Sequence, residues 1–221
     1  MSHWYRTAKA HPCGVLLAVQ VLGILLYPFM ENSGIGRALF SIFGLLVLVL
    51  AVWDVNRTPA LNWIALLLGL PVVVLTILEV VHSENVTLVL WSNVLHALFY
   101  FYTAYGLIAY MFADEWVTRD EVFAIGAAFT VVAWGFAYVF TATQIVWPQS
   151  FIAAVNPDAA RTWMELLFLS VTTLTSTGLS DVVPVHSNAR SFVMIEQIAG
   201  MLYLALVVAR LVGLTIARFR R

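Results

Sequence analysis

A run of small, hydroxyl-bearing residues in the last quarter of the chain has the chemistry to bind a cation. Its members are Thr175, Ser176, Thr177, Gly178, Leu179, Ser180 and Asp181. The run is poor in helix formers, and an extended segment of this composition presents carbonyl and hydroxyl oxygens that can replace the water shell of a cation. Asp181 adds a carboxylate at its end. These residue types predict a cation-binding segment over 175–181.

The residues before this run predict a short helix. Asn156, Pro157 and Asp158 have the pattern of a helix start, with a capping asparagine, a proline in the first position and an acid in the first turn. Residues 161–173 continue as a mostly apolar stretch. About 13 helical residues cover roughly 20 Å, which is too short to cross the roughly 30 Å hydrocarbon core of a bilayer.

The lengths of the short helix and of the hydroxyl-rich run match a re-entrant hairpin. About six extended residues at about 3.3 Å each cover roughly 20 Å, so the run can return the chain to the side from which the helix entered. Non-helical backbone survives at membrane depth only where protein buries it or where it lines a wet cavity. The carboxyl end of the short helix carries a partial negative charge, which favours a cation there.

The composition places the chain in a membrane. Of the 221 residues, 62% are hydrophobic and 10% are charged, whereas a soluble domain has roughly 25% charged residues. We expect an integral membrane protein without a soluble domain. The formal net charge of -1 argues against a nucleic-acid partner, which needs a basic patch. Cys13 is the only cysteine, which excludes an internal disulfide and a multi-cysteine metal site. No cofactor is expected.

Apolar stretches long enough to cross the bilayer occur six times, since a spanning helix needs about 20 residues. They cover residues 13–30, 36–54, 60–81, 88–112, 121–146 and 190–216. The sequence predicts an all-α integral membrane protein with six transmembrane helices and the re-entrant segment between the fifth and the sixth. We expect a four-helix membrane domain over 1–116. A pore domain over 117–221 would contain helix five, the short helix, the hydroxyl-rich run and helix six.

Basic residues indicate the orientation, because an even number of spans places both termini on one side. That side carries Arg6, Lys9, Arg57, Arg119, Arg218, Arg220 and Arg221, and the other side carries Arg37, Arg161 and Arg190. Cytoplasmic loops hold the excess of lysine and arginine, so both termini are predicted to be cytoplasmic. We expect a multi-pass protein of the plasma membrane.

The stretch from Ser170 to Pro184 resembles the pore of potassium channels, whose signature runs Thr-Val-Gly-Tyr-Gly-Asp after a threonine-rich helix end. The residues in register with it are Ser170, Val171, Thr173, Leu174, Thr175, Gly178, Asp181 and Pro184. Residues 202–214 are similar to the last helix of small bacterial six-helix channels. The resemblance covers roughly residues 160–215. It implies a homotetramer that conducts monovalent cations, K⁺ or Na⁺, through residues 175–181.

Three departures from the signature affect the expected selectivity. Thr177, Leu179 and Ser180 stand where the family has valine, tyrosine and a second glycine. That glycine permits a positive φ, so serine in the same conformation costs roughly 1 kcal/mol or more. The hydroxyl groups also suit a partly hydrated ion. We expect the Ser-Thr-Gly-Leu-Ser-Asp filter to be weakly K⁺-selective or non-selective, with Ca²⁺ or Mg²⁺ binding at the pore mouth beside Asp181.

Two residues of the last span are further candidates. Glu196 lies about 9 Å inward of Arg190 along a helix, and an ionisable residue at that depth is a functional candidate by default. We expect its carboxyl group to pack behind the filter and to hydrogen-bond the short helix; direct ion contact is the alternative. Gly200 is either a gating hinge, as glycines of this helix are in the family, or a point of close helix contact.

Acidic and histidine residues also gather near the outer ends of the third and fourth spans. They are Glu79, His82, Glu84 and His96. A divalent metal site is one interpretation, but their spacing fits no standard site. We expect solvated loop residues instead.

The fourth span is informative because residues 85–118 contain no lysine or arginine. A voltage sensor needs several basic residues in the field, each worth about 2.3 kcal/mol per 100 mV. We therefore expect the four-helix domain to lack voltage-sensor arginines.

The predicted function is passive ion conduction rather than catalysis. An intramembrane enzyme would need a convergent nucleophile, base or metal set, which the scattered acids and histidines do not supply. A transporter component is an alternative, although carriers usually contain paired broken helices and the 157–184 pattern has no second copy. A non-conducting relative of the channels is another, because Leu179 and Ser180 depart from the signature.

Overall fold

The structure is a computed structural model that describes residues 11–30, 43, 47, 49–51, 62–82, 84–113 and 118–219. Most of the span expected at 36–54 lies outside these residues. So do several basic residues on which the orientation depends, namely Arg6, Lys9, Arg37, Arg57, Arg220 and Arg221. The second span and the cytoplasmic termini stay predictions.

The chain forms two compact units, Met1–Val132 and Ala133–Arg221. The division falls inside helix α6 (Arg119–Val146). It separates two groups of mutually packed residues, whereas the expected domains 1–116 and 117–221 separate two functions. The functional division stays a prediction.

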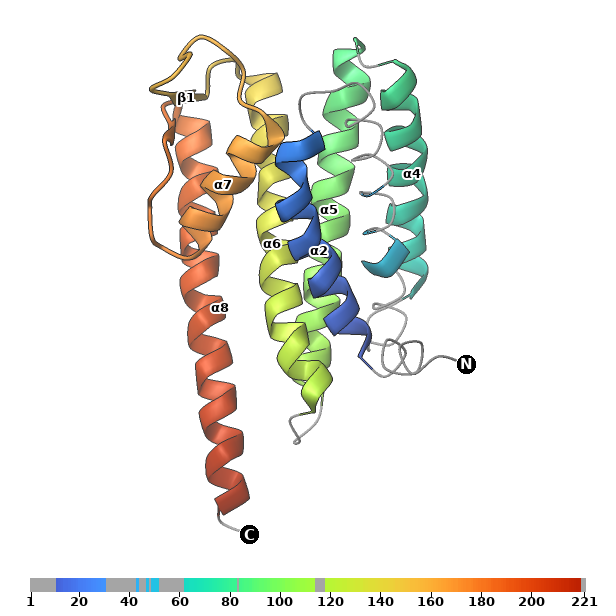
Figure 1. Ribbon diagram of the computed structural model, residues 1–221, viewed down its shortest axis with the longest axis vertical. Helices are drawn as coiled ribbons and strands as arrows, with labels where there is room; N and C mark the ends of the chain where they lie inside the picture. Colours follow the sequence, from blue (N-terminus) through green and yellow to red (C-terminus); the bar gives the residue numbers. More distant parts are fainter. Residues whose placement is uncertain are drawn as a thin grey trace. The chain divides into compact units, whose positions relative to one another are not determined.

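The first unit is helical throughout its described part. Its helices are α2 (Pro12–Met30), α4 (Asn62–Val81), α5 (Val86–Met111) and the beginning of α6. A short connection joins α4 to α5, and the two pack side by side (Figure 1). The side chain of Asn85 caps α5 by accepting a hydrogen bond from the Leu88 N–H at 3.2 Å. Between α6 and α2, the hydroxyl of Thr130 donates to the buried Gln20 side chain at 2.7 Å.

The second unit combines helices with a small sheet. Its elements are the end of α6, β1 (Phe151–Ala153), α7 (Trp163–Leu174), β2 (Val182–Pro184) and α8 (Ser187–Phe219). The strands pair antiparallel, with Phe151 opposite Pro184 and Ala153 opposite Val182. α7 lies against the first half of α8, and the strands lie near the beginning of α8 (Figure 1).

Aromatic rings fix the short elements of this unit on α6. The ring of Trp163, the first residue of α7, meets Trp134 edge-on at 5.2 Å and Tyr138 at 5.6 Å between centroids. Phe151 of β1 packs on Phe140 at 5.2 Å. Such aromatic pairs add stability beyond the area they bury, so the start of α7 and strand β1 are both held by α6.

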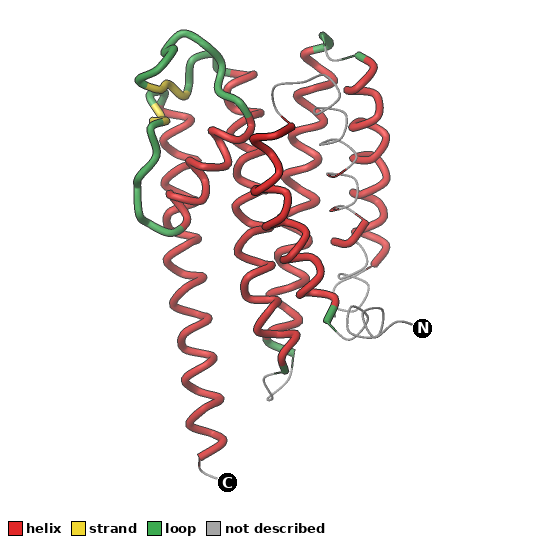
Figure 2. The backbone as a smooth tube through the Cα atoms, viewed as in Figure 1, coloured by secondary structure: helices red, strands yellow, loops and turns green. Residues whose placement is uncertain are grey.

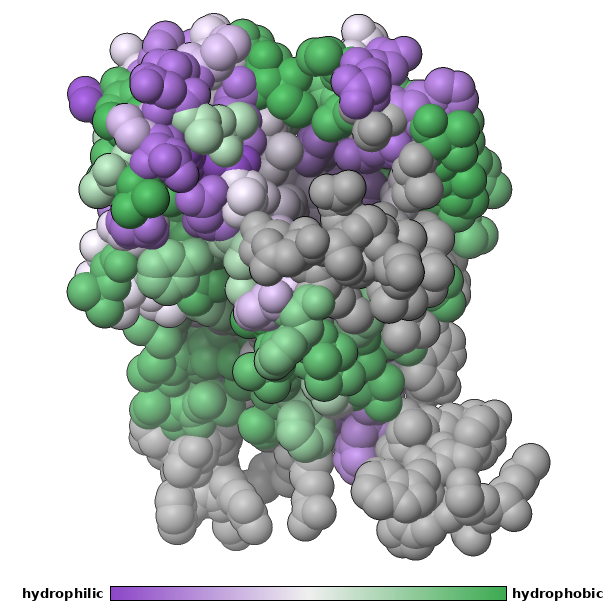
Figure 3. Space-filling view, turned by 45° about the horizontal axis from the view of Figure 1, so that its top comes forward, coloured by the Kyte–Doolittle hydropathy of each residue, from purple (hydrophilic) through white to green (hydrophobic). Residues whose placement is uncertain are grey.

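Length and surface character identify the helices that can cross a bilayer. Of the described helices, four are long and apolar enough: Pro12–Phe29, Val86–Met111, Asp120–Val146 and Ser187–Gly213. α4 and α7 contribute shorter apolar stretches. On α8, Ile198 and Met201 are 61% and 60% exposed. The surface of this unit is hydrophilic around the strands and hydrophobic further along α8 (Figure 3). Apolar surface of this extent requires cover by lipid or protein.

Most of the expected helices are present. The predicted spans 13–30, 60–81, 88–112, 121–146 and 190–216 coincide with α2, α4, α5, α6 and α8. The all-helical prediction was wrong at β1 and β2, because strands of three residues give too short a pattern to detect. The number of membrane crossings stays a prediction.

Candidate functional site

The short helix α7 begins later than the sequence pattern suggested. Its N-cap is Thr162, whose hydroxyl accepts from the Glu165 N–H at 3.3 Å, while the Glu165 carboxylate accepts from the Thr162 N–H at 2.6 Å. This capping box satisfies the first N–H groups of the helix. The prediction of a helix start at Asn156 was wrong, because Asn156 lies in a turn with a φ of 51°. The Thr162-x-x-Glu165 pattern was the signal that could have located the start.

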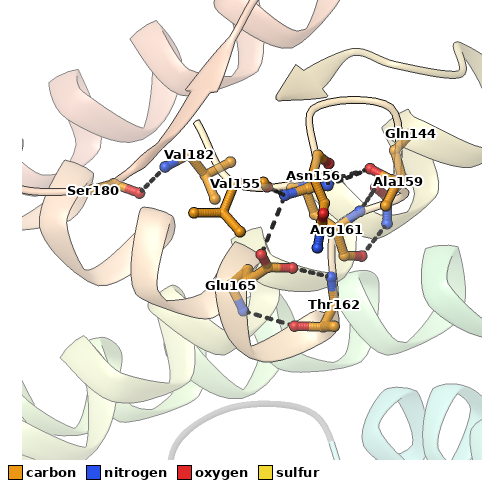
Figure 4. Close-up of polar contacts among 9 residues, drawn as sticks. All are labelled: Gln144, Val155, Asn156, Ala159, Arg161, Thr162, Glu165, Ser180 and Val182. Atoms are coloured by element: carbon orange, nitrogen blue, oxygen red, sulfur yellow. Dashed lines mark hydrogen bonds and ion pairs between the residues drawn. The ribbon is translucent and has the colours of Figure 1, made fainter. Parts of the chain in front are cut away.

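Arg161 organises the loop that leads into α7. The residue is 5% exposed, and its guanidinium group lies among loop carbonyls (Figure 4). Its acceptors there are the carbonyl oxygens of Val155, Asn156 and Ala159. It also donates to the Glu165 carboxylate at 3.3 Å. The Gln144 side chain pairs with the Arg161 backbone at 2.9 and 3.0 Å, so α6 holds the loop in place. Sequence reasoning had used Arg161 only for orientation.

α7 ends in a hydrogen-bonded cap that begins the hydroxyl-rich run. The Thr177 N–H donates to the Thr172 carbonyl at 2.9 Å, and the Ser176 N–H donates to the Thr173 carbonyl at 2.9 Å. These two bonds form a Schellman motif, which places the residue after the cap in the left-handed conformation. Ser176 occupies that position.

The left-handed residues of the run lie two apart. Ser176 has a φ of 58° and Gly178 a φ of 65°. The prediction of a positive φ at Ser180 was wrong: among the described residues of the run other than glycine, Ser176 in the helix cap has a positive φ and Ser180 does not. A β-carbon on Gly178 would meet no atom within 4 Å. The backbone conformation, rather than space, therefore favours glycine at this position.

Thr175 and Thr177 place two hydroxyl oxygens together at the start of the run. The Thr175 hydroxyl donates to the Val171 carbonyl at 2.7 Å, and the Thr177 hydroxyl donates to the Thr172 carbonyl at 3.2 Å. The two hydroxyl oxygens lie 3.0 Å apart, and both residues are exposed. With their hydrogens directed to α7, both oxygens keep lone pairs that can attract a cation.

The far end of the run joins strand β2. The Ser180 hydroxyl accepts from the Val182 N–H at 3.1 Å (Figure 4). Leu179 is 77% exposed, and Asp181 is also exposed. Figure 2 shows this stretch as non-helical chain that leaves the end of α7 and turns back toward the strands. The cap at one end and the β1–β2 pairing at the other thus hold all seven predicted site residues in one segment. Ion binding by them stays a prediction.

α8 contacts α7 at two positions, Ser170 and Leu174. Glu196 is 0% exposed, and the Ser170 hydroxyl contacts both its carboxyl group and, at 2.8 Å, the carbonyl of Ala133 on α6. One turn on, Gly200 lies against the backbone of Leu174, the last residue of α7. Close packing against the Leu174 backbone therefore leaves no room for a β-carbon at Gly200. A role for Gly200 in gating stays a prediction.

The acidic and histidine residues of the first unit form no metal site within the described chain, where no group of three or more such ligands occurs. The expectation that they are solvated loop residues was wrong for Glu79, which lies inside α4, and for His96, which is 6% exposed and lies inside α5. Its ring contacts the Ser92 carbonyl at 2.8 Å and the Thr76 hydroxyl at 3.3 Å. Hydrogen bonds to α4 and α5 therefore compensate the His96 ring for the water that it loses on burial.

The second unit places a short helix and a non-helical segment between two long helices. Two long apolar helices flank a short capped helix and a non-helical, hydroxyl-rich return. Residues 126–216 match a family model described as an ion channel. The comparisons with curated proteins and with solved structures give no match. The matched residues thus resemble an ion-channel domain, which supports the likeness of the chain to the potassium-channel superfamily, and the match together with the apolar helices supports a membrane protein.

Proposed function

We propose that the protein is a homotetrameric cation channel whose ion path runs along residues 175–181. The observation that carries this proposal is the segment itself, a short helix whose capped end leads into a hydroxyl-rich return between two long apolar helices. One such segment cannot enclose a pore. Closed rotational symmetry solves this, because four copies around one axis bring four segments face to face.

The permeant ions we propose are K⁺ and Na⁺, with weak discrimination between them. Strict selection requires a rigid array of carbonyl oxygens. Here the run has hydroxyl groups at Thr175 and Thr177 and an exposed leucine in place of the bracing tyrosine. Asp181 would place a ring of four carboxylates at the pore mouth, where Ca²⁺ or Mg²⁺ would bind. Neither a cofactor nor a nucleic acid takes part in this function.

In this proposal the channel lies in the plasma membrane with both termini in the cytoplasm. Gly200 is the candidate at which α8 bends to gate the pore. The first four helices support the pore domain without acting as a voltage sensor, because residues 85–118 lack basic side chains.

The assembly is tested by determining the mass of the purified protein in detergent and by cross-linking. Four copies are expected. A stable monomer or dimer as the only species would contradict the proposal, because the segment would then have no symmetry mates with which to enclose a pore.

Conduction is tested by recording currents from the purified tetramer in planar bilayers. Discrete single-channel currents in KCl or NaCl are expected. A tetramer that inserts and remains silent would favour a non-conducting relative of the channels. Flux that needs a coupled second solute, without discrete openings, would favour a transporter component.

A further inference from the structure

Glu196 is a carboxyl group buried where three helices meet. It lies on α8 with 0% of its surface exposed, and Ser170 on α7 and Ala133 on α6 complete the contact. A buried charge needs a partner of opposite sign or several hydrogen-bond donors. Among the described residues, no ion pair involves Glu196. The surroundings therefore do not suit a carboxylate anion.

The hydrogen bonds at Ser170 require a second proton. Its hydroxyl oxygen lies 2.8 Å from the Ala133 carbonyl and within hydrogen-bond distance of the Glu196 carboxyl. A serine hydroxyl has one hydrogen to donate, and the Ala133 carbonyl can only accept. If Ser170 donates to Ala133, the bond to Glu196 needs a hydrogen on the carboxyl group. A protonated Glu196 satisfies both contacts at once.

The second carboxyl oxygen supports the same protonation state. Oε2 of Glu196 is buried and has no hydrogen-bond partner among the described residues. In a carboxylate this oxygen would carry half of the negative charge without a donor. In the neutral acid this oxygen is an uncharged carbonyl oxygen, and leaving it without a hydrogen-bond donor costs much less free energy.

Few other titratable groups face this site. α7 contains only Glu165, in its first turn, and the part of α6 in this unit contains only Tyr138. On α8 itself the other titratable or charged residues are Arg190, Tyr203, Arg210 and Arg218. Arg190 lies about 9 Å and Arg210 about 21 Å along the helix from Glu196. None of these cations is close enough to form an ion pair with the carboxyl group.

We infer that Glu196 is a positioning residue whose carboxyl proton bonds α8 to the short helix α7, and that loss of this proton as pH rises releases α7. The effect on ion flow rests on the proposed channel function. Ionisation transfers the proton to water. The Ser170 hydrogen must then turn to the carboxylate, which deprives the Ala133 carbonyl of its donor. The bond that positions α7, five residues before the start of the hydroxyl-rich run, is thus present in the acid form and lost in the base form.

The proton itself is tested by infrared spectroscopy of the full-length protein in lipid nanodiscs at neutral pH. The carbonyl stretch of a protonated carboxyl group is separate from carboxylate bands. We expect Glu196→Gln to remove such a band and Asp158→Asn, which changes an exposed loop carboxylate of the same unit, to leave it. A spectrum that Glu196→Gln does not alter in this region would overturn the inference.

The hydrogen bond is tested with Ser170→Ala, which also serves if Glu196→Gln fails to fold. Loss of the hydroxyl should leave the carboxyl band but shift it to higher frequency, since the acid has lost its acceptor. A band at the wild-type frequency in Ser170→Ala would overturn the assigned bond between Ser170 and Glu196.

The consequence for conduction is tested by K⁺ currents in bilayers over a pH series. Above the titration midpoint the neutral fraction of a carboxyl group falls about tenfold per pH unit, and the wild-type current should fall with it. The Glu196→Gln current should not, because the amide keeps a donor toward Ser170 at every pH. An unchanged pH profile in Glu196→Gln would overturn the switch. Absence of current from every variant would contradict the channel proposal instead. The infrared result would still show whether the Glu196 carboxyl group is protonated.

Discussion

Gly200 lies so close to the Leu174 carbonyl that a β-carbon on residue 200 would approach its oxygen to less than 3.0 Å, a separation that real β-carbons do not show. One turn earlier on both helices, Glu196 meets Ser170. The two contacts have the same sequence offset, so they fix the register of α8 against α7. The end of α7, where the hydroxyl-rich run begins, is held by both of them.

We predict that Gly200→Ala destabilises the protein by about 1–3 kcal/mol, the usual cost of overpacking a close contact. The clash is with backbone, so α7 or α8 must move. Gly213→Ala is the matched control, because a β-carbon there meets nothing within 4 Å. It should stabilise α8 by roughly 0.5–1 kcal/mol. Thermal unfolding in detergent measures both, and equal midpoints for the two variants would contradict this prediction.

Substitutions at Ser176 should reveal its left-handed conformation. Ser176→Gly is expected to stabilise the protein by up to about 1 kcal/mol, because glycine adopts a positive φ without a steric cost, while its freedom in the unfolded chain offsets part of the gain. Ser176→Val should destabilise it by about 1–2 kcal/mol. Ser191→Gly, at an exposed position inside α8, should have the opposite sign from Ser176→Gly, with a loss of about 0.5 kcal/mol. Unfolding midpoints that fall for both glycine variants would argue against the cap.

Arg161 should be far more sensitive to substitution than the exposed Arg190 in the first turn of α8. Arg161→Ala removes the guanidinium donor from three carbonyl oxygens and a carboxylate, and we expect a loss of at least about 2 kcal/mol. Arg161→Lys should recover only part of it, since lysine lacks the planar fork. Arg190→Ala removes one exposed bond to Pro184 and should cost about 0.5 kcal/mol. Limited proteolysis of the 154–160 loop gives a local readout, and unchanged cleavage in Arg161→Ala would count against this role.

The positions of the long helices can be predicted well from the sequence, and those of the site residues only in part. Hydropathy locates α6 and α8 to within a few residues because a membrane span needs an unbroken apolar stretch. The start of α7 was misplaced because local helix-start signals compete, and the capping box at Thr162 prevailed over Asn156. The left-handed φ at Ser176 could not be expected from a match to the channel signature. It follows from hydrogen bonds to Thr172 and Thr173 that form only once α7 has ended.

Other parts of the site depend on residues far apart in the chain. Arg161 is held by Gln144 on α6, and Ser170 by Ala133 and Glu196. No local pattern encodes which carbonyl a buried side chain will meet. Glu196 was recognisable as a candidate from its depth in the span, but its partners required the packed helices.

Conductance should depend only weakly on voltage. Residues 85–118 contain no basic side chain that could move through the field, where each charge contributes about 2.3 kcal/mol per 100 mV. Open probability measured from about -100 to +100 mV should therefore change shallowly. Steep activation would show that a sensor lies elsewhere in the chain.

Selectivity should sharpen when the family residues are restored. Leu179→Tyr combined with Ser180→Gly would return a bracing hydroxyl and backbone freedom to the filter. In a K⁺–Na⁺ gradient we expect the double variant to move the reversal potential toward the K⁺ equilibrium potential. Leu179→Phe, which adds the ring without the hydroxyl, is the control and should move it less. A wild-type potential already near the K⁺ value would contradict weak selectivity.

The pairing of β1 with β2 has a consequence for the number of residues that the hydroxyl-rich run can contain. Val182 is 1% exposed and Val183 is 47% exposed, so a slip of one residue in β2 would turn the buried side chain outward. The strand therefore cannot slide to take up or release chain, and the cap at Ser176 fixes the opposite end. An inserted or deleted residue between these anchors would have to be absorbed inside the segment itself. The small sheet thus sets the number of residues in the run, so the spacing of its hydroxyl and carbonyl oxygens depends on a hydrophobic contact outside it.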